Sequence, residues 1–163
     1  MSLTVRIATS ADAELIAELA DKIWKHHYVP IIGIDQVNYM LSKMYSKESL
    51  INQMKNDGHV FYIGYDNDNE AIAYASISDK NGDLFLHKFY IDSDRQTKGF
   101  GTKLAAIVEQ KYPHKKTMQL TVNRQNYKAI NFYFKQGFKI ECVADFDIGS
   151  GYFMNDFVMV KKY

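Results

Sequence analysis

Residues 90–108 read YIDSDRQTKGFGTKLAAIV, and this stretch decides the fold. An aromatic and β-branched run ends at Ile91, a polar segment follows, and Gly99 and Gly101 lead into a segment of helical periodicity. The pattern predicts a strand, a loop and a helix, with glycine where the helix begins. A helix N-terminus carries unpaired N–H groups and a partial positive charge, and glycine lets an anion approach them. This segment around Gly99 and Gly101, the glycine joint, is therefore either an ordinary turn or a phosphate-binding site.

Composition indicates one folded domain, and we expect residues 1–163 to form it. A hydrophobic fraction of 47% and an aromatic fraction of 14% argue against disorder. Because the net charge is only +1, we expect neither nucleic acid nor a membrane as a partner. The single cysteine, Cys142, excludes an internal disulfide and a cysteine-based zinc site, and we expect no metal. Without a signal peptide or an apolar run of about 20 residues, a cytoplasmic protein is expected.

The rest of the chain predicts an α/β domain with a mixed sheet. Residues 5–7 form a short strand, and three segments between residues 11 and 58 have helical apolar spacing. Strands follow at 60–65, 71–77 and 84–91, and later at 118–122, 138–148 and 152–161. Helices fill the segment from the glycine joint to Pro113 and residues 126–136. The expected order is β-α-α-β-β-β-α-β-α-β-β.

Two common phosphate-binding motifs are absent from the sequence, because residues that each of them requires are missing. A P-loop needs Gly-x-x-x-x-Gly-Lys-Ser/Thr, and the chain contains no such string. A dinucleotide site needs a third glycine where this chain has Leu104, and an acidic residue at the end of the next strand, where residues 119–123 have none.

Two motifs resemble those of the GCN5-related N-acetyltransferases. Residues 96–101, QTKGFG, match the Gln/Arg-x-x-Gly-x-Gly/Ala signature, and residues 126–138, NYKAINFYFKQGF, match Asn-x-x-Ala-x-x-Phe-Tyr-x-x-x-Gly-Phe. The resemblance covers the whole chain and implies that the joint holds the pyrophosphate of acetyl-CoA, with CoA as product. In this family the backbone of the strand before the joint also contacts the pantetheine arm. The implied coenzyme-binding set is Phe89, Tyr90, Ile91, Arg95, Gln96, Thr97, Lys98, Gly99, Phe100, Gly101, Thr102, Asn126, Ala129 and Tyr133.

The resemblance and the chemistry both indicate Tyr133 as a catalytic general acid. Asn126 and Tyr133 lie seven residues apart, so they fall on one helix face. A phenol of pKa about 10 can protonate the thiolate that leaves when an amine attacks the thioester directly in a ternary complex. The base that deprotonates the amine stays open between His87, Asp156 and a water relay.

The acceptor is expected to be a small-molecule primary amine, because three stretches resemble the bacterial spermidine/spermine branch of the family. These are residues 26–28, 33–41 and 149–159, and they supply Tyr28, Asp35, Tyr39 and Asp156 as candidate substrate contacts. Acetylation of a protein or peptide amine, and a non-catalytic acetyl-CoA-binding module, are the alternatives. Exposed edges of the sheet and the two final strands favour a homodimer.

Overall fold

The computed structural model describes residues 2–95 and 97–163, which form two compact units. The first unit comprises Met1–Ser78 and Lys88–Pro113, and the second comprises Asp79–His87 and His114–Tyr163. Strands β3 (Ala71–Lys80) and β4 (Asp83–Ile91) pass from one unit into the other. The strand order is β1-β2-β3-β4-β5-β7-β6, and both parallel and antiparallel pairs occur, so the sheet is mixed as predicted.

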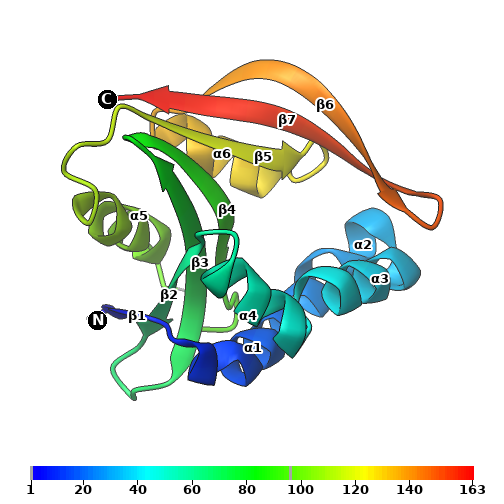
Figure 1. The fold of residues 1–163 in the computed structure, drawn as a ribbon, viewed down its shortest axis with the longest axis horizontal. Helices are drawn as coiled ribbons and strands as arrows, with labels where there is room; N and C mark the ends of the chain where they lie inside the picture. The colour runs from blue at the N-terminus through cyan, green and yellow to red at the C-terminus, as the bar shows by residue number, and fades with distance from the viewer. Residues whose placement is uncertain (1, 96) are drawn as a thin grey trace. The chain divides into compact units, whose positions relative to one another are not determined.

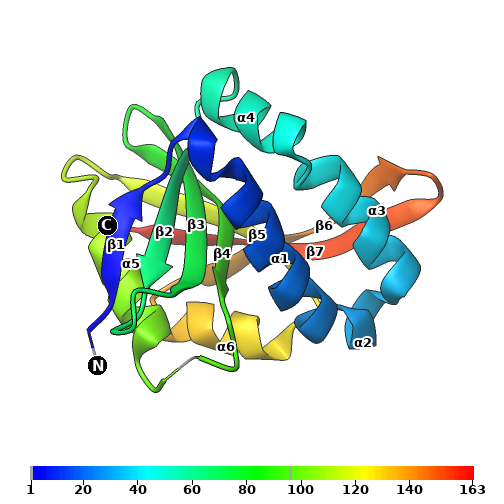
Figure 2. The ribbon, with the colours of Figure 1, turned by 90° about the horizontal axis from the view of Figure 1, so that it is seen from below.

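In the first unit, β1 (Thr4–Ile7), β2 (Val60–Tyr65) and β3 lie side by side and antiparallel (Figure 2). Across residues 10–55, all of which are described, the chain forms a short 3₁₀ helix and four α-helices. The sequence pattern predicted three helical segments in this region, whereas the expected order of elements contained only two helices there. These elements are η1 (Ser10–Asp12), α1 (Ala13–His27), α2 (Val29–Ile32), α3 (Ile34–Met44) and α4 (Lys47–Lys55).

The extra helix, α2, arises at the segment where the helical pattern breaks. Pro30 stands in the first turn of α2, where a missing N–H costs nothing because that group has no intrahelical partner. Gly33 ends α2 with a φ of 83°, a conformation that favours glycine, and α3 starts at the next residue. A proline that interrupts one apolar stripe therefore begins a new helix.

Buried tyrosines and a tryptophan form much of the first unit's core. The Trp24 indole donates to the Tyr74 hydroxyl at 3.2 Å, and Tyr74 donates to the Tyr45 hydroxyl at 2.9 Å. Burial raises the pKa of the Tyr45 and Tyr74 phenols well above its ordinary value. These phenols therefore stay neutral and act as hydrogen-bonding parts of the core.

The second unit is built on strands β5 (Thr117–Asn123), β6 (Lys139–Gly149) and β7 (Tyr152–Lys162). The beginning of β4 pairs with β5 in parallel, while β7 runs antiparallel to both β5 and β6 (Figure 1). Buried and half-buried residues alternate along β5, which fits a strand with one face on the core. Helix α6 (Tyr127–Lys135) connects β5 to β6.

A type I′ turn joins β3 to β4. Asn81 and Gly82 have φ values of 55° and 93°, which are the two left-handed conformations that this turn requires. A Cβ on Gly82 would lie 2.6 Å from the carbonyl oxygen of His114, so close backbone approach also demands glycine here. Within the described residues, no helix is both long and apolar enough to cross a membrane.

Candidate active site

The glycine joint follows β4, and helix α5 (Phe100–Gln110) begins directly after Gly99. Gly99 is the N-cap residue and has a φ of 89°, in the left-handed region. A Cβ there would meet no atom within 4 Å, so the backbone conformation, not a lack of space, favours glycine. The Lys103 N–H donates to the Gly99 carbonyl at 3.0 Å. The N–H groups of the first turn before Lys103 are the ones that a phosphate could accept from.

The side chains of the joint differ in what they can offer a ligand. Lys98 and Thr102 are exposed, whereas the Phe100 ring is buried in the core. The Phe100 side chain is therefore not available to a ligand. The carbonyl of Thr97 accepts from the Phe100 N–H at 3.2 Å, which closes a turn before the helix. Gln96, which begins the family signature, lies outside the described residues.

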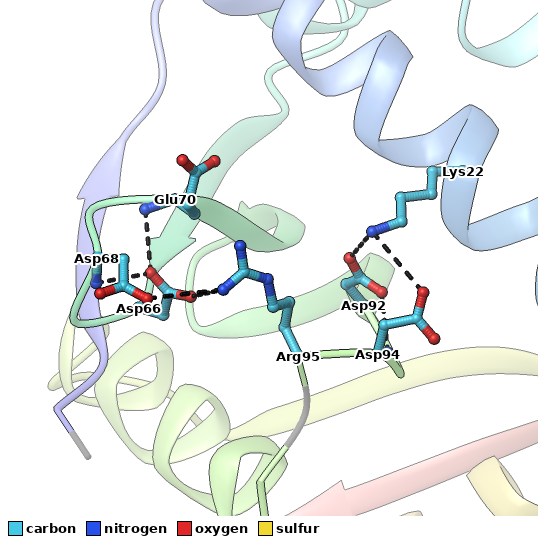
Figure 3. Close-up of polar contacts among 7 residues, drawn as sticks. All are labelled: Lys22, Asp66, Asp68, Glu70, Asp92, Asp94 and Arg95. Atoms are coloured by element: carbon cyan, nitrogen blue, oxygen red, sulfur yellow. Dashed lines mark hydrogen bonds and ion pairs between the residues drawn. The ribbon is translucent and has the colours of Figure 1, made fainter.

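Arg95, predicted to contact the coenzyme, is engaged with carboxylates. Its Nη1 lies 3.4 Å from Asp66 Oδ2 and 3.7 Å from Asp68 Oδ2, both in the turn between β2 and β3 (Figure 3). Three residues earlier, Asp92 forms an ion pair with Lys22 of α1. Neither partner could be inferred from the sequence, because both are far from the joint along the chain.

The end of β4 places alternate side chains on opposite faces. Tyr90 packs against Tyr74 and Trp24, with ring centroids 5.4 and 5.7 Å apart, and its hydroxyl lies 3.3 Å from that of Tyr28. Two predicted residues, Tyr28 and Tyr90, are thus brought together in the first unit. Phe89 and Ile91 are half-buried and alternate with Tyr90.

His87 also lies on β4, in the part that belongs to the second unit. Its ring centroid is 4.6 Å from that of Phe85, two residues away on the same face of the strand. The side chain is half-buried. His87 therefore packs against Phe85, in addition to its predicted role as a possible base.

Helix α6 carries the second family motif. The Asn126 side-chain oxygen accepts from the Ala129 N–H at 3.3 Å, so Asn126 caps the helix. Tyr133 is buried, and its ring lies 5.5 Å from Phe132 and 5.6 Å from Phe138. Tyr133 therefore lies on α6, and Asn126 is the residue that caps this helix.

The remaining predicted acceptor residues occupy different settings. Asp35 is exposed in the first turn of α3. One turn later, the Tyr39 hydroxyl accepts from Lys43 Nζ at 3.2 Å, and the ammonium lies 5.4 Å from the ring centroid. This contact shows that the Tyr39 ring can receive a cation.

Asp156 on β7 is a buried carboxylate in the second unit, with 3% of its surface exposed. Burial raises the pKa of its carboxyl to about 6, although a hydrogen bond with Thr121 and the charge of Arg124 act in the opposite direction. The Arg124 guanidinium bonds Asp145 Oδ1 at 2.8 Å and the backbone carbonyl of Asp156 at 3.1 Å. Among the described residues, the Asp156 carboxylate therefore has no salt bridge.

The sequence reasoning missed Lys88, a buried cation of the first unit. Its Nζ donates to Gln53 Oε1 at 2.8 Å and lies 5.3 and 5.5 Å from the ring centroids of Tyr45 and Phe61. Burial lowers the pKa of its ammonium to about 8. A signal was present: Lys88 falls on the same strand phase as the buried Leu84 and Leu86.

Comparison with known proteins settles the family. The acetyltransferase (GNAT) domain family matches residues 29–145, so the chain belongs to the GNAT acetyltransferases. This membership confirms the resemblance, the enzyme class and acetyl-CoA as the acetyl donor.

Individual relatives extend the likeness over the full chain. A spermidine N(1)-acetyltransferase from Thermoplasma acidophilum is 29% identical, with 100% of this chain and 99% of the relative covered. The PaiA N-acetyltransferase structure from the same organism, in complex with coenzyme A, has a TM-score of 0.82 at 28% identity and covers both chains completely. A peptidyl-lysine N-acetyltransferase, YiaC of Escherichia coli, is 32% identical over 47% of this chain and 48% of the relative. The predicted fold class is thereby confirmed.

Proposed function

We propose that the protein transfers the acetyl group of acetyl-CoA to a primary amine of a polyamine-type small molecule. The observation that carries this substrate class is the full-length likeness to the spermidine N(1)-acetyltransferase. The YiaC likeness spans less than half of the chain, so it supports acetylation of a protein lysine less strongly. A non-catalytic acetyl-CoA-binding module is the third alternative.

The donor side of the proposal rests on the glycine joint. The first-turn N–H groups of α5 would bind the pyrophosphate, with Gly99 and Gly101 leaving room for it and Lys98 adding positive charge. The other coenzyme contacts are proposed as predicted, from the backbone of Phe89 and Ile91 and from the α6 motif. A backbone N–H of β4 would polarise the thioester carbonyl.

Two proton transfers must accompany the reaction. An alkylammonium of pKa about 10.4 costs about 4.6 kcal/mol to deprotonate at pH 7, because the gap is about 3.4 units at 1.36 kcal/mol each. The amine then attacks the thioester carbon, and the carbon–sulfur bond breaks. Tyr133 is proposed to donate its phenolic proton to the departing CoA thiolate.

On the acceptor side, Asp156 is the best-supported contact for an ammonium. Its carboxylate is buried and has no salt bridge among the described residues, so a cationic ligand would supply the missing charge. Tyr28, Asp35 and Tyr39 remain proposed contacts. The base remains a choice between His87, Asp156 and water.

Three further expectations stay predictions. They are a single domain over residues 1–163, a cytoplasmic location and assembly as a homodimer. Sedimentation of the purified protein would test the assembly.

The experiment that tests the function is the variant Tyr133→Phe, assayed by thiol release with polyamines, amino acids and peptides as acceptors. Loss of the general acid should lower kcat about 100-fold or more, while the Kd for acetyl-CoA stays within about twofold. Tyr127→Phe is the matched control, since Tyr127 is on the same helix and 70% exposed.

The outcomes separate the alternatives. Turnover of peptides but not of polyamines would favour the protein acetyltransferase. Binding of acetyl-CoA without turnover of any acceptor would favour the binding module. Full activity of Tyr133→Phe would refute the assignment of the acid.

A further inference from the structure

The glycine joint is held from two sides by charged side chains that lie far from it in sequence. Lys22 of α1 pairs with Asp92, the first residue after β4. Arg95 pairs with Asp66, in the turn between β2 and β3. Figure 3 shows both pairs, with Lys22 and Asp66 approaching the same loop from different elements.

On the Asp66 side, one buried carboxylate serves two purposes. Its side chain is only 2% exposed, and Oδ1 accepts from the N–H groups of Asp68 at 2.9 Å and Glu70 at 3.0 Å. The other oxygen, Oδ2, is 3.4 Å from Arg95 Nη1. The turn therefore fixes the carboxylate, and the carboxylate holds the arginine.

On the Lys22 side, Asp92 is fixed in the same manner. Its N–H donates to the Ile72 carbonyl at 2.7 Å, and Oδ1 accepts from the Asp94 N–H at 3.0 Å. Oδ2 accepts from Lys22 Nζ, which raises the pKa of that ammonium. The Asp92 side chain is 7% exposed, so this contact is better shielded from solvent than an ordinary surface pair.

We infer that Lys22 and Asp66 are positioning residues for the coenzyme, and that Arg95 acts through Asp66 instead of contacting a phosphate. The inference rests on the proposed function of the joint. A loop anchored at Asp92 and Arg95 loses less conformational entropy when its N–H groups converge on an anion. The pairs should therefore affect coenzyme binding, and not the chemical step.

The direction of one effect separates this role from a direct contact. Asp66→Asn keeps an oxygen to accept from Asp68 and Glu70 but removes the charge that holds Arg95. If Arg95 positions the loop, the Kd for acetyl-CoA should rise about fivefold, the size expected for a pair worth about 1 kcal/mol. If Arg95 binds phosphate directly, freeing its guanidinium should leave the Kd unchanged or lower it.

The Lys22 side provides an independent arm. Lys22→Met should raise the Kd and the KM for acetyl-CoA about threefold to fivefold, with kcat at saturation unchanged, and Lys22→Arg should restore both. Lys25→Met is the matched control, because Lys25 is on the same helix but forms its ion pair with Asp21 of that helix, at 2.8 Å. It should change neither constant.

Titration calorimetry with acetyl-CoA and steady-state kinetics measure these effects, and thermal unfolding checks each variant's fold. If Asp66→Asn is too unstable to measure, Asp68→Asn replaces it, because the exposed Asp68 carboxylate also lies 3.7 Å from Arg95 Nη1, and the Kd should again rise if Arg95 positions the loop. If Lys22→Met is too unstable, Lys22→Gln replaces it with the same expected direction. A wild-type protein that does not bind acetyl-CoA would refute the proposed function and this inference together. Normal binding by wild type, with unchanged or tighter binding by both single variants, would refute the inference alone.

Discussion

Among the described residues, each unit of the molecule buries a charged side chain that forms no ion pair, Lys88 in the first and Asp156 in the second, and the two are accommodated differently. Lys88 is 9% exposed and Asp156 is 3% exposed, and neither forms an ion pair among the described residues. Burial shifts both pKa values toward the neutral form, to about 8 for the ammonium and about 6 for the carboxyl. At neutral pH each is nevertheless mainly charged.

The difference lies in what surrounds each charge. The Lys88 ammonium donates a hydrogen bond to the Gln53 amide oxygen and faces two aromatic rings. These contacts stabilise its charge without a carboxylate. Asp156 lies beside an arginine that bonds Asp145 and the Asp156 backbone, leaving the carboxylate to Thr121. The comparison teaches that Lys88 belongs to the packing of its unit, whereas Asp156 is suited to a cationic ligand.

Asp156→Asn should have the largest effect, because it removes the charge but keeps the shape and an oxygen for Thr121. We expect kcat/KM for spermidine to fall about 30-fold, equivalent to about 2 kcal/mol. A monoamine of similar length should be affected much less if Asp156 contacts a second ammonium, and equally if Asp156 is the base. Equal activity of variant and wild type with both amines would contradict either role.

The same variant should be more stable than wild type at pH 7. The folded-state pKa of Asp156 lies above the unfolded value of 3.8, so the folded protein binds more protons between about pH 4 and 6. Stability from this group therefore falls as the pH rises through that window. Urea unfolding at pH 4 and pH 7 should show that Asp156→Asn abolishes this part of the pH dependence.

Lys88→Met should change stability more than activity. The pKa is lowered from 10.5 to about 8, a cost of about 3 kcal/mol at pH 7, from which about 1 kcal/mol is subtracted for the lost Gln53 hydrogen bond. The expected gain is about 2 kcal/mol in the free energy of unfolding, measured with urea. Kinetics with acetyl-CoA and an amine should stay within about threefold of wild type.

The pH dependence of the free energy of unfolding tests whether Lys88 is a buried structural cation. Between about pH 8 and 10.5 the unfolded chain binds the proton more readily, so the folded state gains stability as the pH rises. Lys88→Met should lack that gain, and Gln53→Glu should reduce it by giving the ammonium a carboxylate. Lys43→Met is the control, since Lys43 faces the Tyr39 ring on the surface. A strong loss of activity in Lys88→Met would assign Lys88 to the chemistry instead.

Most of the fold could be predicted because its signals are local. A run of apolar and aromatic residues predicted β2, alternation predicted β5, and the Asn81-Gly82 pair predicted the turn before β4. The helical region was less predictable, since Pro30 interrupts the pattern without showing whether a loop or a new helix follows. The long β6–β7 hairpin was expected from its two strands, but the order β5-β7-β6 depends on pairing between distant segments.

In the candidate site, too, the features carried by short local motifs were predictable, and those that depend on tertiary contacts were not. Gly99 at the start of α5 and Tyr133 on α6 were predicted because short motifs carry them. The partners of Arg95 and Asp92 could not be predicted, because Asp66 and Lys22 are brought to them only by tertiary folding. Lys88 could have been found from its strand phase, but the burial that lowers its pKa, and its hydrogen bond to Gln53, 35 residues away, arise only in the folded chain.

The smallest expected effect concerns the surroundings of Asp156. The charge of Arg124 lowers the pKa of that carboxyl, and the charge of Asp145 raises it. Arg124→Met should therefore move the acidic limb of kcat/KM for the amine to higher pH, and Asp145→Asn should move it to lower pH, each by about half a unit. Because the two shifts have opposite signs, a general loss of structure cannot produce both. Shifts of the same sign, or none, in profiles measured from pH 5 to 8 would show that the limb belongs to another group, and would return Asp156 to the same purely structural role as Lys88.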